Sequence, residues 1–418
     1  LQLVMLPQVV GFALLGLLVI GFAAISFRRG GLWRSLAIVL AGMVVGAALA
    51  WIGMFLMGQA RPGSFWRAYP IWTQLTVYAC GLLAAVAALA LIGRRLTVEQ
   101  LRASFWLAFL LLGVAIFFIA PGGVIYFLLP PLAAIVGILL KQERVGAIIA
   151  AVLLWLTFGE VLALLGDLMN NGPFFIFAPL ALIIAMPWLI EAKALLDTNS
   201  KGRTITVAAA VMLAGWAAVA VAPAYSADRQ QRFLIQHATD TGTGHAYWSV
   251  VNDRARLPKD FGNVAGWRRN ELPHIEGKRW IAPTATVADL TPPKLSVMSN
   301  TGDGKVRTIT FRIEANGAET IFLVGAKDAQ IVSAGSGGFV RPIAPDTKGE
   351  YYLSCFGRSC DGAVLQFSTR ELKPMPFTLI GSRRGLPAIA KPLLEQRPRF
   401  ARPQYSPDAT LTISRVAL

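Results

Sequence analysis

The chain has 418 residues, of which 55% are hydrophobic, and its mean hydropathy is +0.56. Soluble domains contain about 45–50% apolar residues, so this composition favours a membrane protein and argues against a wholly soluble chain. The formal net charge is +16, but the basic residues are scattered and many lie between apolar runs, so we expect no nucleic-acid partner.

Apolar runs that are long enough to cross a bilayer occupy the first half of the chain. A spanning helix needs roughly 20 mainly apolar residues. Backbone polar groups must be paired within the segment in hydrocarbon, so the runs predict α-helices. The chain begins inside such a run without Met or a charged segment, so we expect further polypeptide upstream. The eight predicted spans are approximately residues 3–27, 33–57, 71–93, 103–120, 122–140, 146–166, 173–192 and 205–222.

Several of these spans contain proline. Each proline removes a helical hydrogen bond, so Pro130 and Pro131 in the fifth span, and Pro179 and Pro187 in the seventh, predict kinks or breaks.

Basic residues are distributed unevenly among the loops that join the spans. The loops after the second, fourth and sixth spans carry only Arg61 and Arg67. Because basic loops remain in the cytoplasm, we expect both ends of this multi-pass protein on the opposite side of the lipid bilayer. That side is the periplasm in a bacterium and the lumen in a eukaryote. The loops after the first, third, fifth and seventh spans carry eleven basic residues, which are Arg28, Arg29, Arg34, Arg94, Arg95, Arg102, Lys141, Arg144, Lys193, Lys201 and Arg203.

Charged residues inside a span are candidates for function. We single out Glu160 and Asp167 near the outer end of the sixth span. Glu160 has two interpretations, an ion-binding or substrate-binding carboxylate and an interfacial carboxylate with a polar partner, and the second is favoured.

Residues 223–418 form the second predicted domain. Pro223 ends the last span, after which alternation of period two replaces the helical pattern. Short strands separated by Gly-rich turns are typical of an all-β, sandwich-like domain. The predicted fold is therefore a multi-span all-α membrane bundle of about eight helices in residues 1–222, followed by an all-β extracytoplasmic domain. The predicted strands are Arg232–Ala238, Ala246–Asn252, Lys294–Ser299, Val306–Ala315, Thr320–Val324, Gln330–Ala334, Tyr351–Phe356, Ala363–Ser368 and Pro376–Ile380.

The chain contains three cysteines. Cys80 lies in the third span, where we expect it to act as a small apolar residue. Cys355 and Cys360 form the sequence "CFGRSC", in which Gly357 permits a tight turn. An oxidising compartment favours a disulfide between them over two free thiols.

The three histidines do not have the spacing of a known metal site. His237 and His245 lie close to Asp240 and Asp253, but a zinc site needs three or four converging ligands and short-spacing signatures, which are absent here. His237 lies in the alternating segment "RFLIQHAT", so a structural histidine is favoured over a catalytic or metal-binding one. We therefore predict no catalytic residue, no metal ligand and no cofactor in this chain.

Two stretches carry a resemblance to a known family. They are "PAYSADRQQRFLIQHATD" at residues 223–240 and "TLIGSRRGLPAIAKPLLEQRPRFARPQYSPDATLTISRVAL" at residues 378–418. Both resemble membrane-anchored zinc exopeptidases of the endoplasmic-reticulum metallopeptidase (Fxna-like) family and its bacterial relatives, related to aminopeptidase Y. The tail combines an R-x-G-L-P motif, a following R-P and a late strand with Asp-x-Thr.

The resemblance implies an order of parts in which a zinc peptidase domain precedes several helices and a β-rich domain. Nothing in this chain matches the zinc ligands of the family. The resemblance thus implies that the chain is the C-terminal, non-catalytic portion of such a peptidase. Zinc is then expected in an upstream peptidase domain of the same polypeptide, and the substrates are expected to be peptides.

Two other functional classes are left open. A transporter-like or scaffold protein is compatible with eight helices that contain prolines, although the spans have few polar residues and no clear repeat. A membrane glycosyltransferase that uses a lipid-linked sugar typically has acidic residues in its first large outer loop. The corresponding loop, "GQARPGSFWRAYP" at residues 58–70, contains none.

Overall fold

The apolar runs of the first half form a helical unit, described here from a computed structural model. The structure describes residues 8–168, 174–194, 201–272 and 275–418. The chain divides into two compact units, Leu1–Ala224 and Tyr225–Leu418, and each is described by itself. The predicted boundary lies two residues before this division.

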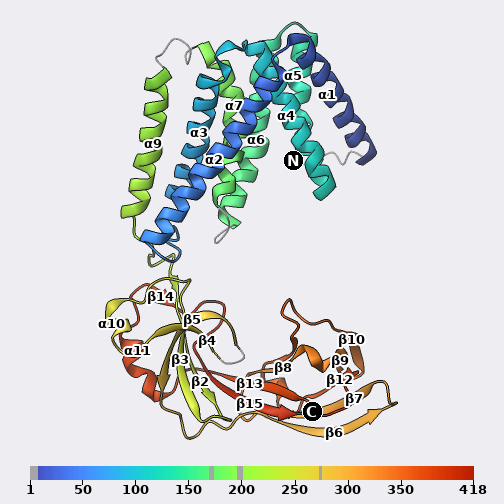
Figure 1. Ribbon diagram of the computed structural model, residues 1–418, viewed down its shortest axis with the longest axis vertical. Helices are drawn as coiled ribbons and strands as arrows, with labels where there is room; N and C mark the ends of the chain where they lie inside the picture. Colours follow the sequence, from blue (N-terminus) through green and yellow to red (C-terminus); the bar gives the residue numbers. More distant parts are fainter. Residues whose placement is uncertain (1–7, 169–173, 195–200, 273–274) are drawn as a thin grey trace. The chain divides into compact units, whose positions relative to one another are not determined.

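Eight helical segments within the described residues are long and apolar enough to cross a membrane, which confirms the prediction of a multi-span bundle (Figure 1). The helices are α1 (Gln8–Arg29), α2 (Leu32–Ala60), α3 (Pro70–Leu91), α4 (Val98–Ile119), α5 (Leu129–Leu139), α6 (Glu143–Leu168), α7 (Phe177–Glu191) and α9 (Lys201–Val221), with the short 3₁₀ segments η1 (Gly93–Arg95), η2 (Pro121–Phe127) and η3 (Phe174–Ile176).

Two of the spans are interrupted near their prolines. The predicted fifth span consists of η2 followed by α5, and Pro130 and Pro131 occupy the first turn of α5. Proline is tolerated there because the first N–H groups of a helix have no partner within the helix. The seventh span starts with η3 and continues as α7, which contains Pro187 in its interior.

Small residues let the central helices approach closely. Gly46 of α2 and Gly81 of α3 lie against each other and against Ala178 of α7. A Cβ atom on Gly81 would lie 2.3 Å from the carbonyl oxygen of Ala178, which is too close for any side chain. Van der Waals packing of this kind holds helices together in lipid, where no hydrophobic force acts between them.

The outer surface of the bundle is apolar. Leu17 is 67% exposed and Leu40 is 61% exposed, as expected of side chains that contact lipid. Two exposed tryptophans of α2, Trp33 and Trp51, are separated by roughly 27 Å of helix. This distance is close to the ~30 Å thickness of the hydrocarbon core, and tryptophans concentrate at its two boundaries. The chain is thus a multi-pass membrane protein.

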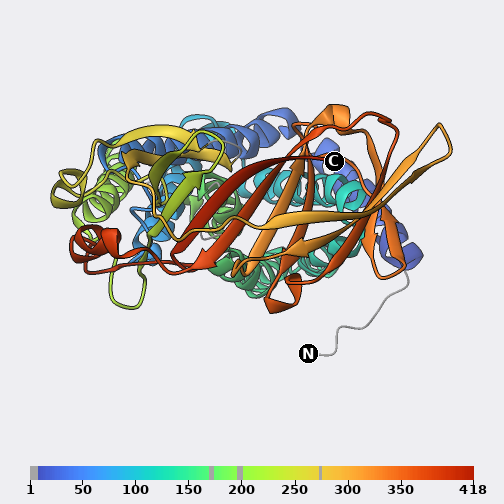
Figure 2. The same ribbon diagram turned by 90° about the horizontal axis from the view of Figure 1, so that it is seen from below.

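The second unit is β-rich, as predicted (Figure 2). Eight strands form one sheet in the order β11-β8-β13-β15-β2-β3-β5-β4, five form another in the order β10-β9-β12-β7-β6, and β1 pairs with β14. The strands are β1 (Gln231–Arg232), β2 (Leu234–Asp240), β3 (His245–Val251), β4 (Arg268–Leu272), β5 (Ile275–Thr284), β6 (Lys294–Gly302), β7 (Arg307–Glu314), β8 (Thr320–Gly325), β9 (Ile331–Ser336), β10 (Phe339–Pro342), β11 (Tyr351–Phe356), β12 (Val364–Thr369), β13 (Pro376–Arg384), β14 (Ala401–Arg402) and β15 (Ala409–Ala417).

Two of the three cores of this unit show how the sheets are covered. Phe311 and Phe367 of the five-stranded sheet pack with Phe377 and Leu379 of β13, so this half of the unit is a sandwich. The other half of the larger sheet is covered by the short helices α10 (Lys259–Gly262) and α11 (Lys391–Glu395), whose residues Phe261 and Leu393 are fully buried.

Five of these strands were not predicted from the alternation of the sequence, namely β4, β5, β10, β14 and β15, although the resemblance implied a late strand where β15 lies. Strand β15 lies in the middle of the larger sheet and runs parallel to β2, while its other neighbour, β13, is antiparallel. The larger sheet is therefore mixed.

Candidate functional site

Four charged side chains link four helices at one end of the bundle. Arg29 at the end of α1 donates two hydrogen bonds to the carboxylate of Glu143 at the start of α6, at 2.7 and 2.9 Å. Arg102 of α4 donates to both oxygens of Glu191 at the end of α7, at 2.6 and 2.5 Å. Arg102 also lies 3.7 Å from Glu143, so the four residues form one connected network.

The network is largely shielded from solvent and carries no net charge. The side chains of Arg102 and Glu191 are only 11% and 14% exposed. Planar, two-point pairing between guanidinium and carboxylate is the strongest form of ion pair in proteins. Each pair joins helices that are far apart in sequence, so we interpret the network as a clamp that fixes the ends of α1, α4, α6 and α7.

The sequence analysis missed this network, since it singled out only Glu160 and Asp167 within the spans. The sequence did contain a signal for such ion pairs, because Glu143 and Glu191 lie at the same end of the predicted spans as Arg29 and Arg102. Only the fold shows which arginine meets which glutamate.

Glu160 lies on the outer surface of α6 and is exposed. It is roughly 26 Å along the helix from Glu143, which places it near the opposite boundary of a ~30 Å hydrocarbon layer. Among the described residues it forms no ion pair. The side chain of Asp167 lies outside the described residues.

His237 is fully buried on β2 of the larger sheet. Its Nε2 donates to the carbonyl oxygen of Ala285 at 3.0 Å, and its ring lies edge-on to Trp248 at 5.0 Å. Its Nδ1 has no hydrogen-bond partner among the described residues. Burial lowers the pKa of His237 because charging the ring would require desolvating a cation. Burial therefore favours the neutral imidazole.

The other residues that were considered as metal ligands do not form a metal-binding cluster with His237 among the described residues. Asp240 Oδ1 accepts hydrogen bonds from the N–H groups of Gly242 and Thr243 in the turn after β2, and His245 begins β3 across that turn. His274 lies outside the described residues. Within the described part of the chain, no three His, Cys, Asp or Glu side chains lie close enough to hold a metal ion. The described residues therefore do not fit a zinc site.

Cys355 and Cys360 form a disulfide with their Cα atoms 5.6 Å apart. Cys355 lies near the end of β11 and Cys360 ends a short 3₁₀ turn. Gly357 has φ +90°, a conformation that L side chains rarely adopt, so glycine is required at this turn. Cys80 is a buried free cysteine of α3.

The two stretches that carry the family resemblance are adjacent in the fold. Strand β2 pairs in parallel with β15, and β1 pairs in parallel with β14. Asp408, which precedes β15, accepts a hydrogen bond from the N–H of Ile235 at 2.9 Å through Oδ1. Its Oδ2 accepts from Arg397 at 2.5 Å. The carboxylate of Asp408 thus links the first strands of the unit to its last segment.

These arrangements join helix ends within the helical unit and strands within the β-rich unit. The chain was compared with protein-family models, with curated proteins and with solved structures, and no match was found in any of the three.

Proposed function

We propose that this chain is the membrane-embedded and C-terminal, non-catalytic portion of a membrane-anchored zinc exopeptidase. In this proposal the helices anchor an upstream peptidase domain and the β-rich unit covers it, so that peptide substrates reach the zinc site past that unit. Zinc and the catalytic residues are assigned to the upstream domain, and no catalytic step is assigned to this chain.

One observation carries the proposal. The segments at residues 223–240 and 378–418 resemble the family, and they pair as the strands β1, β2, β14 and β15 and are joined by Asp408. The two segments lie side by side and pair with each other. Resemblance of both segments to the same family therefore supports a common architecture more strongly than resemblance of two segments that lie apart would. The order of eight candidate spans followed by a β-rich unit also agrees with the order that the resemblance implies.

The proposal places the β-rich unit outside the cytoplasm. The support is the distribution of basic residues, with eleven at one end of the bundle and only Arg61 and Arg67 in the loops at the other. The disulfide between Cys355 and Cys360 agrees with an oxidising compartment. The protein would then be located in the inner membrane of a bacterium with the unit in the periplasm, or in a eukaryotic membrane with the unit in the lumen.

The test uses the complete reading frame that contains this chain. The purified protein is assayed for bound zinc by mass spectrometry and for release of N-terminal residues from short and long peptides. Residues 1–418 are assayed in parallel, as is the complete protein without residues 225–418. We expect zinc and peptide hydrolysis only when the upstream polypeptide is present, and a changed preference for peptide length when the β-rich unit is removed.

Three results would contradict the proposal. Tightly bound zinc and peptide hydrolysis by residues 1–418 alone would place the catalytic site in this chain. Absence of both from the complete protein would remove the peptidase assignment. Substrate-dependent flux through liposomes that contain residues 1–418 would indicate a transporter instead.

A further inference from the structure

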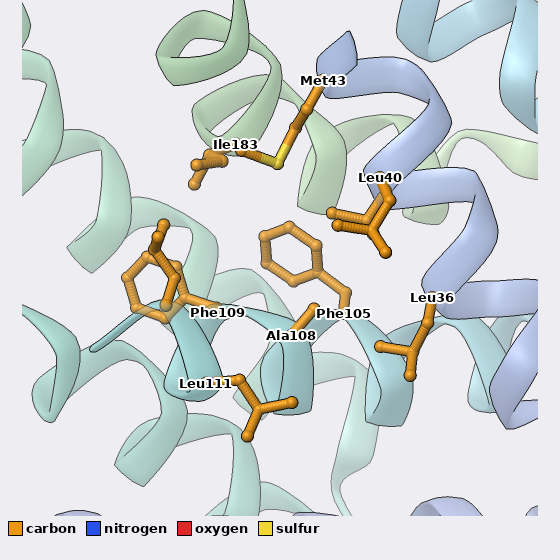
Figure 3. A pocket seen from close by; sticks show the side chains of 10 residues that line it. Leu36, Leu40, Met43, Phe105, Ala108, Phe109, Leu111 and Ile183 are labelled. Carbon is orange, nitrogen blue, oxygen red and sulfur yellow. The ribbon is translucent and has the colours of Figure 1, made fainter. Parts of the chain in front are cut away.

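A cavity of about 250 Å³ lies among α2, α4 and α7 (Figure 3). Leu36 and Met43 of α2, Phe105, Ala108 and Leu111 of α4, and Ile183 of α7 are among its ten lining residues. All ten lining side chains are apolar. A water molecule would find no hydrogen-bond partner in this apolar lining, so the cavity suits a hydrocarbon group better than water.

The cavity opens onto the outer surface of the bundle. Leu40 and Leu111 line it and are 61% and 46% exposed, respectively. In a bilayer, this surface faces acyl chains. The volume of about 250 Å³ is far above the roughly 10–15 Å³ that a single water-sized group requires on the same measure, so there is room for part of one acyl chain.

One end of the cavity lies close to a concentration of positive charge. Leu36 is less than two turns from the start of α2, at the end of the bundle where Arg28, Arg34, Arg94 and Arg95 are exposed. We call these four residues the basic end. None of them forms an ion pair with the described residues, and the nearby Glu143 and Glu191 are already paired with Arg29 and Arg102.

The same end has the features of a headgroup region. Trp33 is 77% exposed one turn before Leu36, and tryptophan rings prefer the depth of lipid headgroups. Surplus arginines near a membrane surface attract anionic lipids, by about fivefold in affinity for each residue, and this attraction acts over roughly 8–10 Å. This end of the cavity therefore lies at the membrane depth where the acyl chains of a phospholipid join its headgroup.

We propose that the cavity between α2 and α4 holds one acyl chain of an anionic phospholipid, whose headgroup lies at the basic end. The apolar lining suits the acyl chain, and the unpaired arginines of the basic end suit the negative charge of the headgroup. The inference concerns only the helical unit and does not depend on the peptidase proposal.

The experiment titrates the delipidated full chain in mild detergent with phosphatidylglycerol or with phosphatidylcholine of the same acyl chains, and native mass spectrometry counts the bound lipids. We expect one phosphatidylglycerol to be retained at the lowest concentrations and a preference of at least fivefold over phosphatidylcholine. Ala108→Phe and Leu36→Phe each fill the cavity from a different helix and should weaken binding of the first lipid about tenfold. The control Val44→Phe adds a ring to the lipid-facing side of α2, where Val44 is 68% exposed, and should change nothing.

The charge is tested by the variant that combines Arg28→Gln with Arg34→Gln. It should reduce the preference for phosphatidylglycerol by between about five- and twenty-five-fold and leave binding of phosphatidylcholine unchanged. Equal binding of the two lipids by the unaltered chain would overturn the anionic assignment. Unchanged lipid binding in both cavity variants would overturn the assignment of the cavity as a lipid site. Loss of a dimer in those variants would instead show that a second copy of the chain covers the cavity.

Discussion

The junction between the first and last strands of the β-rich unit gives the sharpest stability prediction. Asp408 accepts from the Ile235 N–H at 2.9 Å and from Arg397 at 2.5 Å, and the Asp408 and Arg397 side chains are only 15% and 12% exposed. Removing one member of such a shielded pair leaves the other without compensation, which costs about 3–5 kcal/mol. We expect Asp408→Ala to lower the free energy of unfolding by about that amount.

The same geometry predicts a graded series. Asp408→Asn keeps an acceptor for the Ile235 N–H but leaves Arg397 without a carboxylate, so it should cost less than Asp408→Ala. Glu319 pairs with Arg384 on the surface, where the side chains are 42% and 74% exposed, so Glu319→Ala should cost less than about 1 kcal/mol. This surface variant is the matched control.

The assay is urea unfolding of residues 225–418, followed by circular dichroism and tryptophan fluorescence. The fragment contains its own cores, so we expect one cooperative transition. A loss below 1 kcal/mol for Asp408→Ala would refute the reasoning. So would strict additivity in a double-mutant cycle of Asp408→Ala with Arg397→Ala, because directly paired residues must show coupling.

Three further predictions concern other parts of the fold. The lowered pKa of His237 means that the unfolded chain binds a proton first as the pH falls. The stability of the β-rich unit should therefore be constant above pH ~6.5 and decline below it, and His237→Phe should flatten the decline in urea midpoints measured between pH 7 and 5. Gly81→Leu should abolish assembly of the bundle, as judged by size-exclusion chromatography, whereas Gly58→Ala, with open space around it, should be tolerated. Cys355→Ser opens the short loop closed by the bond to Cys360 and should cost about 2 kcal/mol in urea unfolding, with no additional loss in dithiothreitol.

The helical unit could be predicted well because hydrocarbon imposes a simple rule on sequence. Each span needs a long apolar run, and all eight predicted runs overlap the helical segments of the structure. The network of Arg29, Glu143, Arg102 and Glu191 could not be predicted in the same way. Its pairing depends on which helices are neighbours, and helix packing in lipid is decided by small residues such as Gly81 rather than by hydropathy.

The β-rich unit was predicted less completely, for reasons visible in particular strands. Strand β5 contains Gly277 with φ +93° and Pro283, and both residues are signals of turns rather than strands. Strand β15 pairs in parallel with β2, which is separated from it by most of the unit. Sequence periodicity indicates that a segment is a strand, but it contains no information on which distant strand lies beside it.

The placement of the helices and of the β-rich unit across the membrane is tested most directly by reporter fusions. Green fluorescent protein and alkaline phosphatase are fused in separate proteins after Lys141, between α5 and α6, and after Leu418. The account predicts fluorescence only after Lys141 and phosphatase activity only after Leu418. Fluorescence at Leu418 without phosphatase activity would place the β-rich unit in the cytoplasm and contradict the account.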